Sequence, residues 1–127
     1  MSETLTYPEW MVMSALWGQK PQTLSEVIAA MGESMDWNYR TYASYLRKLT
    51  EKGFVGVETH GRDNFYYPLV EQKDCIRAES RGLLRKVSKK SAKALLVCMI
   101  EESGLTPKDH EELKKLLDDL AKGGDAQ

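Results

Sequence analysis

Hydrophobic and polar positions alternate with helical periodicity in three short stretches near the start of the chain, residues 6–18, 23–32 and 38–50. Residues three and four apart share one side of a helix, so each stretch predicts a helix with one buried face. The apolar faces are Trp10, Met13, Leu16 and Trp17 in the first; Leu24, Val27, Ile28 and Met31 in the second; Tyr39, Tyr42, Tyr45, Leu46 and Leu49 in the third.

The polar residues that precede the first two stretches have the spacing of helix caps. Thr6 is followed three residues later by Glu9, and Thr23 by Glu26, which is the pattern of a capping box. Pro8 falls in the first turn, where its missing N–H costs nothing. Gly18 follows the last apolar residue of the first stretch and Gly32 that of the second, and each ends its predicted helix.

Residues 54–70 change to the pattern of a β-hairpin. Phe54, Val55 and Val57 precede, and Phe65, Tyr66 and Tyr67 follow, the turn sequence HGRDN at residues 60–64. Pro68 ends the second strand because it cannot donate to the ladder. Residues 20–23 form a short loop or a minimal strand. Three helices followed by a hairpin is the element order of a winged helix-turn-helix.

Beyond residue 70 the pattern is helical only, in residues 71–87, 91–104 and 106–124. A segment of this size buries too little apolar surface to be stable alone. Packing against a second copy solves this, and packing back on the N-terminal domain is the alternative. The residues predicted to form the dimer interface are Leu83, Leu84, Leu95, Leu96, Met99, Ile100, Leu113, Leu116, Leu117 and Leu120.

The sequence therefore predicts a mostly α (α+β) protein: a winged helix-turn-helix DNA-binding domain at residues 1–70, a helical dimerisation domain at 71–122 and a disordered tail at 123–127. Hydrophobic residues make up 42% and charged residues 29%, as in ordinary globular proteins. No stretch resembles a signal peptide or a membrane-spanning helix, and the two cysteines form no CxxC motif. We therefore expect a cytoplasmic protein with reduced thiols and no membrane insertion.

The net charge of −1 hides a local basic surface on the third helix. Arg40, Ser44 and Arg47 lie opposite its apolar face, and Thr41 and Lys48 flank them. A helix fits the major groove of DNA, where Arg grips guanine and Thr contacts thymine or phosphate. Arg62, at the tip of the hairpin, is placed to meet phosphate or the minor groove. The predicted DNA-binding residues are Asn38, Tyr39, Arg40, Thr41, Ser44, Arg47, Lys48 and Arg62.

A second basic stretch, residues 77–93, carries seven Lys or Arg against Glu79 alone. It is interpreted as a solvated helix face, with a phosphate-facing surface as the alternative.

The chain resembles the penicillinase-repressor family of bacterial transcription regulators (the BlaI/MecI/CopY group). The resemblance rests on LTYPEWMVMSALW, on DW before the third helix, on LRKLTEKGFVGVETHGRDNFYYPLV and on LTPKDHEELKKLLDDL, and it covers residues 5–120. It implies a homodimeric winged-helix repressor on a palindromic promoter operator, controlling antibiotic resistance or metal homeostasis, in some members with a membrane sensor protease as partner. The family's base-contacting K-T-x-x-T stretch falls on Arg40, Thr41 and Ser44.

Two features depart from that family pattern. The β-lactam-responsive members are cut at an Asn-Phe bond, and the matching position here is Cys98-Met99. The copper-responsive members end in CxC motifs, which this chain lacks, so no metal or other cofactor is predicted. Cys98 lies among apolar residues, where a free cysteine is most often a buried hydrophobe, and a redox switch at this thiol is the alternative.

No catalytic constellation is present, so the protein is not predicted to be an enzyme. His60 is interpreted as a solvated turn residue, and there is no Gly-rich phosphate loop or HExxH-type site. The alternative function is a winged-helix protein-interaction module that does not bind DNA. The basic face of the third helix argues against that alternative, since such modules usually lose it.

Overall fold

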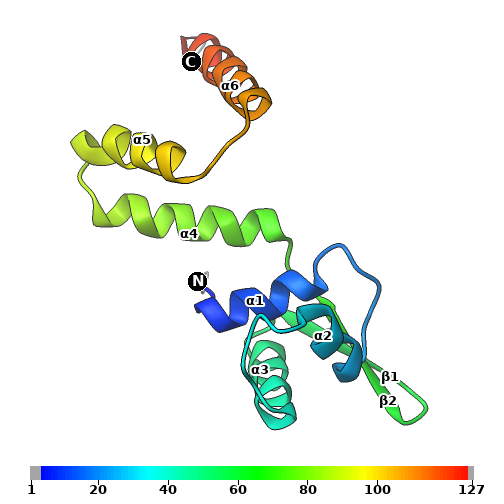
Figure 1. Ribbon diagram of the computed structural model, residues 1–127. Helices are drawn as coiled ribbons and strands as arrows, with labels where there is room; N and C mark the ends of the chain where they lie inside the picture. The colour runs from blue at the N-terminus through cyan, green and yellow to red at the C-terminus, as the bar shows by residue number, and fades with distance from the viewer. Residues whose placement is uncertain (1–3, 126–127) are drawn as a thin grey trace. The chain divides into compact units, whose positions relative to one another are not determined.

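A computed structural model describes residues 4–125 of the chain and divides it into two compact units, Met1–Leu83 and Leu84–Gln127. The elements, labelled in Figure 1, are α1 (Tyr7–Leu16), α2 (Leu24–Met31), α3 (Tyr39–Glu51), β1 (Val55–His60), β2 (Asp63–Pro68), α4 (Gln72–Lys86), the 3₁₀ turn η1 (Lys89–Ser91), α5 (Ala92–Glu102) and α6 (Pro107–Asp125). Three helices followed by a two-stranded antiparallel sheet confirm the predicted winged helix-turn-helix.

Both predicted capping boxes are present. Thr6 begins α1: its backbone N–H donates to Glu9 over 2.9 Å, and its hydroxyl accepts from the Glu9 N–H. Thr23 and Glu26 make the same reciprocal pair at the start of α2, with distances of 2.8 and 3.2 Å. Each box satisfies two N–H groups that a helix start otherwise leaves unpaired. The local sequence therefore fixes where both helices begin.

The hairpin is longer than predicted. Its ladder runs from Val55–Pro68 to His60–Asp63, so only Gly61 and Arg62 remain in the turn. Gly61 has φ +65°, the left-handed conformation that a two-residue turn with glycine first requires. This turn lets pairing continue into residues that the sequence placed in the loop, and it holds Arg62 at the tip.

A third, minimal strand ties the start of α2 to the hairpin. Gln22 and Tyr66 exchange two backbone hydrogen bonds of 2.9 and 2.7 Å. The Gln22 side chain also donates to the carbonyl of Ala15 over 2.8 Å. The stretch predicted as a loop or minimal strand is therefore the latter, and it fixes the hairpin beside α2.

The core of the N-terminal unit lies between α1, α2, α3 and the first strand. Its most buried side chains are Val12, Met13, Leu16, Val27, Leu46, Leu49 and Val55. Cys75 of α4 joins this core, and Trp17 donates from its indole nitrogen to the carbonyl of Val70 over 2.9 Å. The compact unit therefore extends to Leu83, past the boundary that the sequence predicted at residue 70.

One polar pair of this unit, Glu9 with Lys52, was not predicted. Glu9 is 2% exposed and accepts hydrogen bonds of 2.7 and 3.0 Å from the ammonium of Lys52, which caps the end of α3. Burial alone would raise the pKa of Glu9, but the hydrogen bonds from Lys52 and Thr6 and the Lys52 charge outweigh it and lower the pKa. The pair joins the first turn of α1 to the end of α3.

Gly56 is needed where β1 meets Tyr67. A Cβ at this position would lie 2.7 Å from Cε2 and 2.6 Å from the hydroxyl oxygen of Tyr67, its partner in the ladder. We expect Gly56→Ala to destabilise the fold by about 1–3 kcal/mol, because the ring must leave its place. Urea unfolding measures this change. In a Tyr67→Ala background the same substitution should cost little, and an equal cost in both backgrounds would contradict the contact.

The C-terminal unit has no buried side chain among its described residues, Leu84 to Gly123. This differs from the sequence expectation for Cys98, which is exposed on α5, whereas the other cysteine, Cys75, is buried. Burial, together with the charges of Asp74 and Glu79, raises the pKa of the Cys75 thiol.

The end of the chain also differs from the prediction. Helix α6 continues to Asp125, through residues expected to be a disordered tail, and residues 126–127 lie outside the described range. Glycine is a poor helix former, at a cost of about 1 kcal/mol per residue relative to alanine, but two glycines at the last turn do not stop a long helix that already exists.

Candidate nucleic-acid interface

Helix α3 begins at a cap built from two of the predicted site residues. The Asn38 side-chain oxygen accepts from the backbone N–H of Thr41 over 3.0 Å and from its hydroxyl over 3.1 Å. The Thr41 hydroxyl proton is thereby committed, and its lone pairs remain as acceptors. The cap also leaves the Asn38 amide nitrogen as that side chain's available donor.

The sides of α3 separate as its periodicity predicts, except that Tyr39, predicted on the apolar side at its edge, is 62% exposed. Tyr42, Leu46 and Leu49 are buried, while Arg40, Arg47 and Lys48 are exposed. Thr41 and Ser44 are half-buried, although Ser44 was predicted opposite the apolar face. The exposed side therefore carries the long basic side chains, and the short hydroxyl side chains lie closer to the backbone.

Two of the basic side chains have intramolecular partners. The Lys48 ammonium lies 5.1 Å from the centroid of the Tyr45 ring, which stacks on Trp37 at 4.6 Å between centroids. Arg47 pairs with Glu51, one turn later, at 3.7 Å. Both contacts are exposed and weak enough to exchange for a phosphate. Arg40 has no ion pair with any residue in the described part of the chain.

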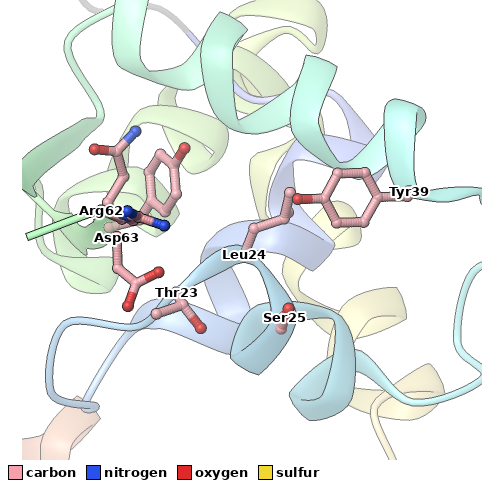
Figure 2. Close-up of a pocket in the computed structure, with 8 residues that line it drawn as sticks. Thr23, Leu24, Ser25, Tyr39, Arg62 and Asp63 are labelled. Carbon is pink, nitrogen blue, oxygen red and sulfur yellow. The ribbon is translucent and has the colours of Figure 1, made fainter.

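The hairpin tip and the starts of α2 and α3 line one cleft of about 220 Å³ (Figure 2). Tyr39, which is 62% exposed, extends from α3 toward Leu24, and Arg62 enters from the hairpin turn. The structure thus brings together two site residues predicted from separate elements. The remaining lining residues are Thr23, Leu24, Ser25, Asp63, Asn64 and Tyr66.

Sequence reasoning did not identify those additional lining residues as part of an interface. It assigned Thr23 to a cap, Leu24 to an apolar face and Asp63 and Asn64 to a turn. The missing information was the Gln22–Tyr66 pairing, which places the start of α2 beside the hairpin. Nothing in the local pattern predicts that contact, because its partners lie 44 residues apart in the sequence.

Other candidate chemistry lies outside this region. His60 is exposed and lies 3.2 Å from Glu58, which agrees with a solvated residue of the hairpin. The described residues include no group of three or more His, Cys, Asp or Glu side chains arranged to hold a metal ion. Within that same range no helix has the length and apolar character to cross a membrane.

The second basic stretch lies on α4, η1 and the start of α5, with all seven Lys and Arg side chains exposed. Arg77 pairs with Asp74 at 3.8 Å, and Arg81 and Arg85 also have partners. These contacts fit the interpretation of this stretch as a solvated helix face.

The predicted dimer residues lie on three helices: two leucines on α4, four apolar residues on α5 and four leucines on α6. Leu95 and Leu113 are half-buried and the other eight are exposed, Leu117 and Leu120 at 61% each. Between Leu84 and Gly123 no side chain is buried, so nothing in this described part of the unit covers the exposed leucine row of α6.

Comparison with known proteins identifies the family. The sequence profile described as penicillinase repressor matches residues 5–119. The methicillin resistance regulatory protein MecI of Staphylococcus aureus is 28% identical over 109 residues, covering 86% of this chain and 89% of that protein. The penicillinase repressor of Staphylococcus aureus is 22% identical over 118 residues, covering 93% of this chain and 94% of that protein.

Solved structures agree at the level of the fold. The PcaV transcriptional regulator of Streptomyces coelicolor superposes with a TM-score of 0.50 at 16% identity, covering 97% of this chain and 79% of that chain. At this identity the likeness concerns the fold alone. Because the family profile spans nearly the whole sequence, the chain belongs to the penicillinase repressor family, whose members are DNA-binding transcriptional repressors and not enzymes.

Proposed function

We propose that the protein represses transcription as a homodimer on a palindromic operator, with one α3 helix in the major groove of each half-site. The observation that carries this proposal is the division of α3 into a buried apolar side and an exposed side with Arg40, Arg47 and Lys48. Helices of this kind contact base edges with residues near their N-terminus. Arg40, Thr41 and Ser44 occupy that part of α3.

We assign Arg40, Thr41 and Ser44 to the bases, and Asn38, Tyr39, Arg47, Lys48 and Arg62 to the DNA backbone. Arg40 suits a bidentate contact with guanine, since it is exposed and free of an ion pair within the described residues. Four of the residues assigned to the DNA backbone lie on α3 or at its cap, on both sides of the base-contacting residues along the chain. The fifth, Arg62, lies on the hairpin. The Lys48 ammonium lies over the Tyr45 ring. It can leave this weak cation–π contact to form a charge-assisted hydrogen bond with a DNA phosphate.

In vitro selection of bound duplexes from a random pool tests this proposal. The expected product is a palindrome whose half-sites lie about one or two helical turns apart, since two recognition helices related by two-fold symmetry face one side of the duplex. Recovery of unrelated sequences without a shared half-site would contradict it.

Arg40→Ala should relax sequence preference at one position of each half-site, at a cost of about 1–3 kcal/mol against the preferred base. Binding to a panel of single-base operator variants measures this effect. Lys48→Ala is the matched control on the same helix. It should lower the affinity for all DNA sequences alike. It should also make that affinity less dependent on salt concentration, because a complex with one phosphate contact fewer releases fewer counterions. Equal weakening of all sequences by Arg40→Ala would make Arg40 a backbone contact.

Dimer formation through α4, α5 and α6 is part of the same proposal. Its support is the absence of buried side chains between Leu84 and Gly123, together with the apolar rows on α5 and α6. A second copy covers such rows in a symmetric interface. Each monomer then contributes one winged helix to the operator.

The regulated genes proposed here are of the antibiotic-resistance or metal-homeostasis type, with the protein acting in the cytoplasm. A membrane sensor protease is the releasing partner suggested by the family resemblance. The bond that is cleaved in the β-lactam-responsive members is Asn-Phe, and this chain has Cys98-Met99 there. We therefore do not propose proteolytic cleavage at that bond. A neighbouring gene for a membrane metalloprotease would favour proteolytic release, and a copper-ATPase gene would favour metal control.

A further inference from the structure

A cleft lies between the hairpin tip and the starts of α2 and α3 (Figure 2). None of the residues that line it is among those assigned to base contacts. Its volume of about 220 Å³ is small, and its lining comes from three elements. Apart from Leu24, every lining side chain carries a polar atom. The cleft therefore suits a small polar group better than an apolar ligand.

The backbone on both sides of the cleft is fixed in advance. The Gln22–Tyr66 pairing holds β2 against the residue that precedes α2, with hydrogen bonds of 2.9 and 2.7 Å. The capping box between Thr23 and Glu26 then fixes the first turn of α2. A ligand seated here does not have to organise these segments, which lowers the entropic cost of binding.

Hydrogen-bond donors predominate among the lining side chains. Arg62 supplies a guanidinium, and Ser25 and Tyr39 supply hydroxyl groups. The Asn64 side-chain oxygen already accepts from the Thr59 hydroxyl over 2.8 Å, so its amide nitrogen is the group left to donate. Arg, Ser, Tyr and Asn are residues that commonly contact phosphate oxygens in protein–DNA complexes.

One residue opposes this chemistry. Asp63, next to Arg62, places a carboxylate in the same cleft and makes no ion pair with any other described residue. A carboxylate accepts hydrogen bonds and repels an oxyanion, so it weakens any phosphate bound beside it.

We propose that this cleft seats one phosphate of the operator backbone and that Asp63 weakens this contact. The inference rests on the proposed function, since it assumes that α3 lies in the major groove. Tyr39 and Arg62 belong both to the cleft and to the predicted interface, which places the cleft where the backbone passes between α3 and the hairpin. A free oxyanion has the same chemistry, but we assign the site to DNA because two lining residues, Tyr39 and Arg62, also belong to the proposed DNA interface.

The test compares Asp63→Asn with Glu58→Gln in the full-length protein. Both substitutions remove one negative charge from the hairpin, but Glu58 does not line the cleft. Affinity for a duplex obtained by selection is measured by fluorescence anisotropy at constant ionic strength. We expect Asp63→Asn to tighten binding by about five- to tenfold and Glu58→Gln by less than about twofold, since exposed charges away from the phosphate are screened.

The phosphate itself is identified by duplexes that carry a neutral methylphosphonate at one backbone position at a time. One position in each half-site should abolish the gain produced by Asp63→Asn, and all other positions should retain it. Ser25→Ala should weaken binding to the unmodified duplex and have no further effect on the duplex modified at that position.

The remaining outcomes would contradict either the phosphate site in the cleft or the proposed function. Equal effects of Asp63→Asn and Glu58→Gln, or a gain that persists at every modified position, would overturn the inference and leave the proposed function intact. Failure of the wild-type protein to select any sequence would instead overturn the proposed function. Saturable binding of inorganic phosphate, seen as chemical-shift changes confined to the cleft without any DNA binding, would overturn the assignment to operator DNA.

Discussion

Replacing Leu117 with Glu should convert the protein from a dimer to a monomer and lower its affinity for a palindromic operator by roughly 100-fold or more, because the second half-site no longer binds intramolecularly. Leu117 is 61% exposed in the single chain and lies in the leucine row of α6. A buried carboxylate without a partner costs several kcal/mol, so a dimer interface over this row cannot accept it. Light scattering coupled to gel filtration measures the mass.

Lys115→Gln is the matched control for this experiment. It changes the net charge by the same amount and lies on the polar side of the same helix, where it should leave both mass and affinity unchanged. A dimer that survives Leu117→Glu with full affinity would show that copies of the chain associate through another surface. An operator half-site should bind the monomeric variant and the wild type equally, since the winged helix is unaltered.

Lys52→Met should destabilise the winged-helix unit by about 2–3 kcal/mol, at or below the lower end of the range for breaking a buried ion pair. The substitution keeps the length of the side chain but leaves the Glu9 carboxylate, 2% exposed, without its ammonium partner. The value is not larger because 32% of the Lys52 side chain is exposed, and water replaces part of the lost contact. Urea unfolding at fixed protein concentration measures the difference.

Glu51→Gln provides the comparison on the same helix. It removes the exposed Arg47–Glu51 pair, which should be worth no more than about 0.5 kcal/mol. Equal costs for the two variants would mean that burial of Glu9 does not govern the stability of the pair.

The same pair gives the stability of the wild type a defined pH dependence. Because the pKa of Glu9 is lowered in the folded state, its contribution is present above the unfolded pKa and is lost as pH falls through the folded value. The difference between the wild type and Lys52→Met should therefore shrink as pH falls from neutral through the lowered folded-state pKa of Glu9, because protonated Glu9 needs no partner. A constant difference across this range would contradict the assignment.

Local signals predicted most of the N-terminal fold correctly because each depends on neighbouring residues. The two capping boxes follow from a threonine and a glutamate three residues apart, and the sides of α3 follow from helical periodicity. The family resemblance, and with it the expectation of a DNA-binding repressor that is not an enzyme, was confirmed over residues 5–119. The division of the site residues between bases and backbone stays a prediction.

Where prediction failed, the deciding contact was distant in sequence or missing from the chain. Cys98 was expected to be buried because its neighbours are apolar, yet no side chain of α5 is buried in the described chain, and the thiol is exposed. The hairpin turn was expected to be longer, since the sequence alone does not show how far a ladder continues once Gly61 adopts its positive φ.

The sequence by itself determined which segments are helix or strand, which side of α3 is basic and which family the chain belongs to, because these properties depend on spacing along the chain. Only the tertiary structure decided that Glu9 reaches Lys52 and that Gln22 pairs with Tyr66. Both contacts join residues more than 40 positions apart, and their energy comes from burial and backbone pairing that exist only after the helices pack. The second contact creates the cleft at the hairpin tip, which the pattern of residues 22–25 and 62–66 does not reveal.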